Sequence, residues 1–322
     1  MAKDPLYHFS WHSAILSTMK QTKKAAFVAA VGRPSAGKST MINRFCGEKV
    51  SIVSAVPQTT RNAIRGIVNS ERGQLVFIDT PGRYKSEKKG NLKLRDISNQ
   101  AVEDSDMILY VLDATRPAGA EEADIAAFVA PHAQKLVAAI NKTDDPNADV
   151  ARARAFLEQS LPALCAENGA ERCFEVSAKT GEGTQEILTV LFDMASEGEP
   201  FYGEEYYTDQ EADFRIAEII REQAINRLQQ EVPHALSVEV ADAQFSRSGI
   251  ADDDAPSRKK LWVRAFIVVE RESQKGIVVG KGGSMVKAIR LASLKELGKI
   301  FDWKIDLDLR VKTGKGRRSG GA

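Results

Sequence analysis

Residues 32–39 constrain the fold more than any other part of the chain, because they match the pattern Gly-x-x-x-x-Gly-Lys-[Ser/Thr]. They follow an apolar run, residues 25–31, and precede residues 39–45, where apolar side chains recur at helical spacing. Glycines in such a turn let backbone N–H groups and the positive end of the helix face phosphate groups. The sequence therefore predicts a strand, a phosphate-binding loop and a helix in succession.

The loop supplies two side chains with expected roles in phosphate chemistry. Lys38 is expected to reach the terminal phosphates, and Ser39 to ligate Mg²⁺. A second motif, Asp-Thr-Pro-Gly, begins at Asp79, directly after another apolar run. Its carboxylate is expected to hold Mg²⁺, and the Gly82 backbone N–H to contact the γ-phosphate. The distance between the two motifs favours a nucleotide site over an ordinary Pro-Gly turn.

A threonine pair lies between these two motifs, within Gln-Thr-Thr-Arg at residues 58–61. A threonine there can close over Mg²⁺ only while the γ-phosphate is present, which makes the segment a nucleotide-dependent switch. Thr60 is the first choice for this role and Thr59 the second. The expected catalytic residues are thus Lys38, Thr60 and Gly82, and the expected Mg²⁺ ligands are Ser39, Thr60 and Asp79.

Two further motifs, each after an apolar run, predict that the base is guanine. The carboxylate of Asp144 in Asn-Lys-Thr-Asp can accept hydrogen bonds from the ring N–H and amine of guanine, which adenine does not offer. Ser-Ala-Lys at residues 177–179 is expected to place a backbone N–H on the guanine carbonyl. The complete expected nucleotide-binding set is Gly32, Arg33, Pro34, Ser35, Ala36, Gly37, Lys38, Ser39, Thr40, Asp79, Asn141, Lys142, Asp144, Ser177, Ala178 and Lys179.

Short apolar runs alternate with helix-like stretches up to about residue 195, which predicts an α/β domain with a mostly parallel sheet and helices on both faces. A stretch of glycine, proline and acidic residues around 196–203 then predicts a linker. Thr208 with Glu211 predicts a capping box that opens a helix. After that helix the pattern predicts two strands, a helical glycine loop, a second helix and a strand.

The formal net charge is only +1, yet residues 271–322 contain far more Lys and Arg than Asp and Glu. This asymmetry favours a nucleic-acid partner for the C-terminal part. The three cysteines have no Cys-x-x-Cys spacing, so neither a disulfide framework nor a zinc knuckle is indicated. We expect a cytoplasmic monomer with no transmembrane segment and no DNA partner.

The motifs resemble those of the Era family of bacterial ribosome-assembly GTPases. The resemblance rests on Gly-Arg-Pro in the phosphate loop, Gln-Thr-Thr-Arg, Asp-Thr-Pro-Gly and similar strings at residues 205–209, 218–222 and 268–272, and it extends from about residue 24 to 312. It implies GTP or GDP with Mg²⁺ as ligands and a C-terminal α+β KH domain of type II. The implied partners are the 3′ end of 16S ribosomal RNA and the small ribosomal subunit.

In KH domains a Gly-x-x-Gly loop clamps the backbone of single-stranded nucleotides. The residues that the resemblance assigns to RNA binding are Gly280, Lys281, Gly282, Gly283, Lys287 and Arg290. The expected division of the chain is an N-terminal extension (1–24), a GTP-binding domain (25–197), a linker (198–208), the KH domain (209–312) and a basic flexible tail (313–322).

One departure from the family pattern concerns catalysis. Arg83 follows Gly82 where many regulatory GTPases have a water-orienting glutamine, so intrinsic hydrolysis is expected to be slow. Two alternative functions stay open from the sequence. One is a nucleotide-gated RNA-binding scaffold with negligible hydrolysis, and the other is a GTPase of tRNA modification or translation.

Overall fold

The computed structural model describes residues 22–54, 56, 59, 62–82, 89–164, 172–229, 232–245 and 260–314. Its first half is a six-stranded sheet in the order β2-β3-β1-β4-β5-β6, in which only β2 runs antiparallel to its neighbour. The strands are β1 (Lys24–Val31), β2 (Ile64–Ser70), β3 (Gly73–Asp79), β4 (Met107–Asp113), β5 (Leu136–Asn141) and β6 (Cys173–Val176). The predicted mostly parallel α/β domain is confirmed.

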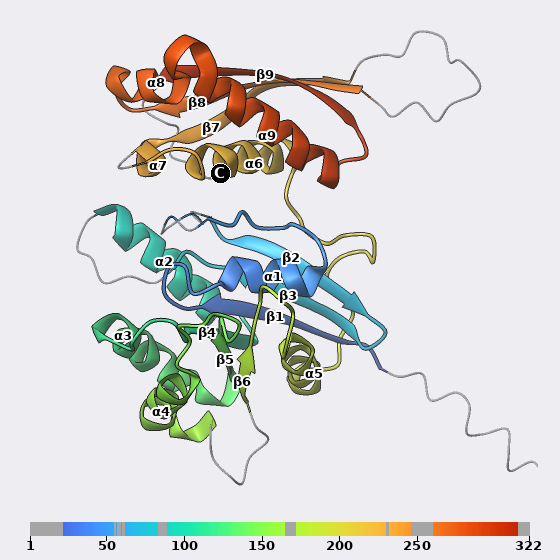
Figure 1. Cartoon of the computed structure of the whole chain (residues 1–322). Coiled ribbons are helices and arrows are strands. Elements are labelled where there is room, and N and C mark those ends of the chain that lie inside the picture. The colour runs from blue at the N-terminus through green and yellow to red at the C-terminus, as the bar shows by residue number, and fades with distance from the viewer. Residues whose placement is uncertain are drawn as a thin grey trace, which may run out of the picture.

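Helices cover both faces of this sheet (Figure 1). They are α1 (Lys38–Cys46), α2 (Lys89–Glu103), α3 (Ala120–Val129), α4 (Val150–Ser160) and α5 (Thr184–Met194), with short 3₁₀ helices at Ala130–Lys135 and Pro162–Leu164. Apolar residues of α1 and α5 pack on one face, and those of α2, α3 and α4 pack on the other. The phosphate loop joins the C-terminal end of β1 to α1, so it lies where ligands bind in such sheets.

The second half is an α+β unit built on a three-stranded sheet in the order β7-β8-β9. The β7 and β8 strands are antiparallel, whereas β8 and β9 are parallel. Its elements are α6 (Ala212–Ile225), α7 (Val232–Ala235), β7 (Ser237–Phe245), β8 (Lys260–Val269), α8 (Glu272–Val279), a 3₁₀ turn (Lys281–Gly283), α9 (Ser284–Ile300) and β9 (Lys304–Thr313). It has its own apolar core. The predicted order of a helix, two strands, a helical glycine loop, a helix and a strand is confirmed, and the short helix α7 before β7 was not predicted.

The connection between the halves lies along the edge of the first sheet. The Tyr207 carbonyl accepts a hydrogen bond from Ile67 of β2 at 2.9 Å, and Thr208 Oγ1 donates to the Arg65 carbonyl at 2.8 Å. The predicted Thr208–Glu211 capping box is therefore wrong. Glu211 itself occupies the N-cap of α6, because the Thr208 hydroxyl is used to fasten the connection to β2.

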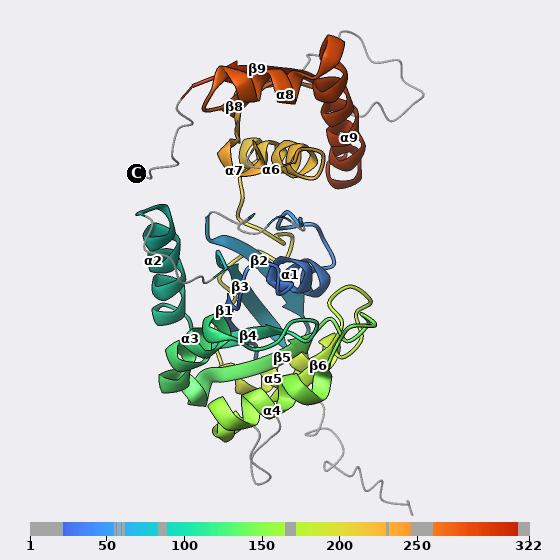
Figure 2. The same cartoon turned by 60° about the vertical axis from the view of Figure 1, so that its left-hand side comes forward.

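The α6 helix faces the first domain on the side of α1 and β2, and both views agree on this arrangement (Figures 1 and 2). The three-stranded sheet and α9 lie beyond α6. Among the residues described, none of the helices combines the length and apolar character that crossing a membrane requires.

Candidate nucleotide and RNA sites

The phosphate loop has the backbone geometry that its glycines predict. Gly37 has φ 103°, and a Cβ added there would lie 2.2 Å from Asn141 Nδ2, so any larger residue would be both strained and obstructed. Gly82 lies against the same loop, since an added Cβ would come within 2.5 Å of Pro34 N. The loops after β1 and β3 are thus in direct contact.

Lys38, which is expected to bind the terminal phosphates, is buried within the phosphate loop. Its Nζ donates to the Gly32 carbonyl at 3.1 Å and to the Arg33 carbonyl at 3.0 Å. Burial lowers the pKa of Lys38 to about 8. An ammonium group has three donor hydrogens, so hydrogen-bonding capacity remains for a phosphate oxygen.

The two described candidates for Mg²⁺ ligation come together. Ser39 Oγ donates to Asp79 Oδ2 at 2.6 Å, and Asp79 is fully buried at the end of β3. Hydroxyl and carboxylate oxygens suit Mg²⁺, which takes its remaining ligands from water and phosphate. The third candidate, Thr60, lies outside the described residues, as does Arg83.

Three loops that follow β1, β5 and β6 are joined through one amide. Asn141 Nδ2 donates to the Ala36 carbonyl at 2.8 Å, and its Oδ1 accepts from the Ala178 N–H at 2.9 Å. Asn141 is buried. It therefore fixes the spacing between the phosphate loop and the loops expected to read the base.

Asp144 is held as a carboxylate next to this junction. Hydrogen bonds from Ser177 Oγ at 2.7 Å and Lys179 Nζ at 3.1 Å lower its pKa. Each carboxylate oxygen has two lone pairs, so a base can bond as well. Lys142 instead donates to Asp113 Oδ2 at 2.6 Å. Burial acts to raise the pKa of Asp113, but hydrogen bonds from Lys142 and Thr115 outweigh it, so the pKa of Asp113 is lowered.

A cavity of about 400 Å³ lies over the phosphate loop. It is lined by the loop, the start of α1, Gly82 and Lys142, and also by the segment between α1 and β2. The described lining residues of that segment are Ile52, Val53, Ser54, Val56 and Thr59. Apart from Thr59, these residues were not identified from the sequence, because the segment carries no motif or periodic pattern.

One residue expected to bind nucleotide has its side chain elsewhere. The Arg33 guanidinium is buried against the carboxylate of Glu122 on α3. Its described contribution to the nucleotide loop is the carbonyl that accepts from Lys38. Another residue, Arg44 of α1, was missed from the sequence and donates to the Lys179 carbonyl at 2.5 Å, so it helps to hold the base-reading loop.

The glycine loop of the second half separates α8 from α9. Gly280, Gly282 and Gly283 all have positive φ, at 72°, 61° and 79°. A Cβ at Gly280 would lie 2.8 Å from Met285 Cβ, whereas Gly282 and Gly283 face open space. Lys281 is exposed beside them, and the loop leads directly into the N-terminus of α9. Open glycines at a helix N-terminus allow close approach of a phosphate.

The two basic residues expected on α9 differ in their surroundings. Lys287 is exposed. Arg290 is only partly exposed, and its guanidinium bonds to the Leu307 carbonyl and lies 3.5 Å from Asp306 of the neighbouring strand β9. Of the three basic residues expected to bind RNA, Lys281 and Lys287 are therefore the exposed ones.

Together, the fold and these loops define a P-loop GTPase domain joined to a KH domain. A family model described as "50S ribosome-binding GTPase" matches residues 27–142, and one described as "KH domain" matches residues 231–318. GTPase Era from Treponema denticola is 50% identical over 292 residues, which cover 90% of this chain and 95% of that protein. The chain belongs to the GTPase Era family, and it is accordingly a GTP hydrolase.

Other relatives agree with this assignment and confirm the resemblance noted from the motifs. GTPase Era from Treponema pallidum is 43% identical over 302 residues, covering 89% of this chain and 92% of that protein. A crystal structure of Era with MgGDPNP and nucleotides 1506–1542 of 16S ribosomal RNA matches with a TM-score of 0.81 at 30% identity, covering 92% of this chain and 96% of that one. A variant of Aquifex aeolicus Era bound to GDP·AlF₄⁻ matches with a TM-score of 0.80 at the same identity and coverage.

Proposed function

We propose that this chain binds GTP with Mg²⁺, hydrolyses it, and couples its nucleotide state to binding of the 3′ end of 16S ribosomal RNA during assembly of the small ribosomal subunit. The observation that carries this proposal is that one chain contains both the cavity over the phosphate loop and the open glycine loop at the start of α9. The Era structure with MgGDPNP and 16S ribosomal RNA supports both ligand classes.

The phosphates of GTP would lie along residues 32–40, with Lys38 as the charge at the terminal phosphates. Ser39 and Asp79, which are already in contact, would hold Mg²⁺, together with Thr60. Mg²⁺ bound there would neutralise charge on the β- and γ-phosphates. Because phosphoryl transfer depends on positioning and charge more than on covalent steps, Lys38, Thr60 and Gly82 are the proposed catalytic residues.

Asp144 would select guanine through its carboxylate, which Ser177 and Lys179 hold ionised. Asn141 would act by fixing the loops, since both polar atoms of its amide are used within the protein. Lys142 forms part of the cavity wall. Asp144 would thus select guanine, and Asn141 would hold the loops in the arrangement that this selection needs.

The RNA backbone would pass over Gly280, Gly282 and Gly283, with Lys281 and Lys287 supplying charge. Arg290 would contribute at the edge of this surface, from its position against β9. We propose the domain limits 25–197 and 209–312, with residues 198–208 as the connection. We further propose that the protein works as a cytoplasmic monomer. Residues 1–21 of the N-terminal extension and the tail beyond Gly314 lie outside the described residues.

Two measurements on the full chain test this function. Single-turnover GTP hydrolysis is expected to be slow but measurable, and to change when 3′-end 16S RNA is added. Sequencing of RNA crosslinked to the GTP-bound protein is expected to recover that RNA end. Crosslinking without hydrolysis would favour a nucleotide-gated scaffold, whereas recovery of tRNA would favour a GTPase of tRNA modification or translation.

A further inference from the structure

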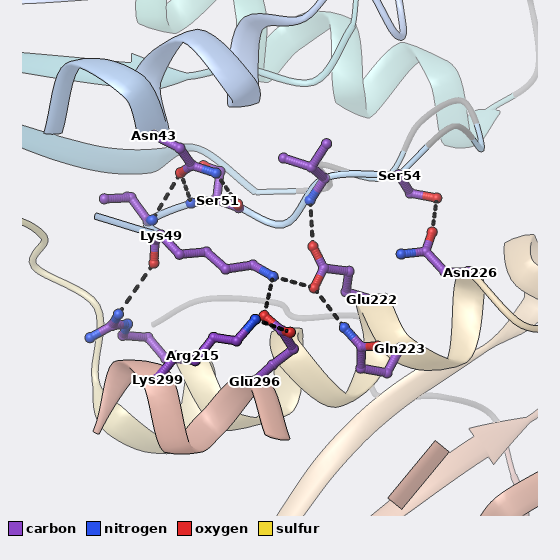
Figure 3. Close-up of polar contacts among 12 residues, drawn as sticks. Asn43, Lys49, Ser51, Ser54, Arg215, Glu222, Gln223, Asn226, Glu296 and Lys299 are labelled. Atoms are coloured by element: carbon purple, nitrogen blue, oxygen red, sulfur yellow. Dashed lines mark hydrogen bonds and ion pairs between the residues drawn. The ribbon is translucent and has the colours of Figure 1, made fainter. Parts of the chain in front are cut away.

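The segment between α1 and β2 is fastened to α6, the first helix of the KH half (Figure 3). Glu222 Oε1 accepts the Val53 backbone N–H at 2.9 Å, and its Oε2 accepts from Lys49 Nζ at 2.5 Å. One residue earlier on α6, Arg221 Nη2 donates to the Thr59 carbonyl at 2.5 Å. Glu222 and Arg221 of α6 thus each form a hydrogen bond with the backbone of this segment, at Val53 and at Thr59.

Additional contacts hold the same segment against the KH half. Ser54 Oγ lies 2.6 Å from Asn226 Oδ1, and the side chain of Val56 packs against the apolar core of the KH domain. At its beginning the segment is fastened to the nucleotide-binding half, because Asn43 of α1 accepts from the Val50 and Ser51 N–H groups at 2.9 and 2.8 Å. The segment therefore bridges the two domains.

The backbone points held by α6 belong to residues that line the nucleotide cavity. Val53 and Thr59 both line it, together with Lys38, Ser39 and Gly82. Lys38 and Gly82 are the residues expected at the terminal phosphate of GTP. The wall of the nucleotide site is therefore supported by side chains from the RNA-binding half.

Both supporting side chains are charged and almost fully enclosed. Arg221 and Glu222 are each only 3% exposed. Buried charges are costly unless hydrogen bonds and partners compensate them, and here Glu218 pairs with Arg221 while Lys49 and Gln223 bond to Glu222. This arrangement restrains the segment to one position, because each buried group keeps its partners only there.

We propose that Arg221 and Glu222 are positioning residues for the γ-phosphate side of the nucleotide cavity, so that the KH half sets the preference of the site for GTP over GDP. The inference rests on the proposed GTP-binding function. GDP would be held mainly by the phosphate loop and the base-reading loops. GTP would also need the wall that carries Val53 and Thr59, and that wall depends on α6.

Charge-neutralising variants of the full chain test the proposal. Arg221→Met removes the donor to the Thr59 carbonyl, and Glu222→Met removes both the acceptor of the Val53 N–H and the charge that faces Lys49. Each is expected to weaken the binding of a non-hydrolysable GTP analogue about tenfold, which is within the usual range of coupling between sites. GDP affinity measured in parallel by calorimetry is expected to stay within about threefold of wild type.

Asp213→Asn is the matched control, because Asp213 is an exposed carboxylate on the first turn of the same helix. It is expected to change neither affinity. Arg221→Lys keeps the positive charge and a donor nitrogen, so it is expected to recover part of the lost analogue affinity. This variant also keeps the test usable if Arg221→Met fails to fold.

Two outcomes would overturn the proposal. Equal loss of GDP and analogue affinity, with a lower melting temperature, would mean that the pair only stabilises the fold. Unchanged affinity for both nucleotides would mean that α6 does not position the wall. In either case wild-type protein that binds GTP and RNA would leave the proposed function intact, whereas wild-type protein that binds no GTP would refute that function itself.

Discussion

The Arg33 guanidinium lies against the Glu122 carboxylate in the interior, so a residue of the phosphate loop is paired with one of α3. Arg33 is 4% exposed and Glu122 is fully buried. Tyr110 of β4 donates its hydroxyl to Glu122 at 2.6 Å. Burial raises the pKa of Glu122, while Tyr110 and Arg33 counteract this by stabilising the charged form. The phosphate loop is thus held by a buried ion pair to α3 as well as by hydrogen bonds to its backbone.

Arg33→Met is expected to lower the free energy of unfolding by about 3 kcal/mol, because it leaves the Glu122 charge buried without its partner. Chemical denaturation measures this change. Removing both charges with Arg33→Met and Glu122→Leu is expected to recover much of the loss. Lys23→Met, which breaks the exposed ion pair with Glu204, is the control and is expected to leave the melting temperature nearly unchanged. A small effect of Arg33→Met alone would contradict the structural role given to this pair.

Lys38→Ala is expected to weaken GTP binding about 10- to 100-fold, which corresponds to the loss of a charged hydrogen bond. The stability of the folded state is not expected to decrease. Burial lowers the pKa of Lys38, so the unfolded chain binds this proton more tightly and the charged lysine opposes folding at neutral pH. Calorimetry and thermal melting measure the two effects. Unchanged GTP affinity would remove the phosphate-loop assignment.

Asp144→Asn is expected to weaken GTP binding about 10-fold or more and to favour XTP, because an amide can donate to the additional carbonyl of xanthine. In the wild type, hydrogen bonds from Ser177 and Lys179 hold the Asp144 pKa below its ordinary value. The carboxylate should therefore remain ionised as the pH falls from 7.5 to about 5, since its ordinary pKa is already near 4. Competition between GTP and XTP at both pH values measures this preference. Loss of GTP preference at the lower pH would exclude Asp144 as the base reader.

Most of the nucleotide site could be predicted because its motifs directly follow the buried strands β1, β3, β5 and β6. Each of these strands is recognisable in the sequence as an apolar run. The antiparallel strand β2 was missed, since its residues 64–70 include glycine, arginine and serine and show no clear alternation. Side-chain pairs could not be predicted either. The partners Arg33 and Glu122 are far apart in the sequence, and no local pattern indicates that the fold brings them together.

The glycine loop of the KH half has room for larger side chains at the positions that RNA is expected to approach. Gly282 has φ 61° and open space around its Cβ position, so a substitution there costs backbone strain but no collision. Aspartate is among the residues that best tolerate this conformation. The loop joins α8 to α9, and in both views it lies farther from the first domain than α6 does (Figures 1 and 2).

Lys281→Asp combined with Gly282→Asp is therefore expected to abolish binding of single-stranded 3′-end 16S RNA, because two carboxylates would repel the approaching phosphates. GTP affinity and melting temperature are expected to change little. The matched control is Gly298→Asp combined with Lys299→Asp, which makes the same chemical change at the exposed opposite end of α9. Filter binding at about 0.15 M salt compares the variants, since phosphate contacts depend on salt. Wild-type RNA affinity in the loop variant would refute the RNA-binding role proposed for this loop, and simultaneous loss of GTP binding would mean that the two domains do not act separately.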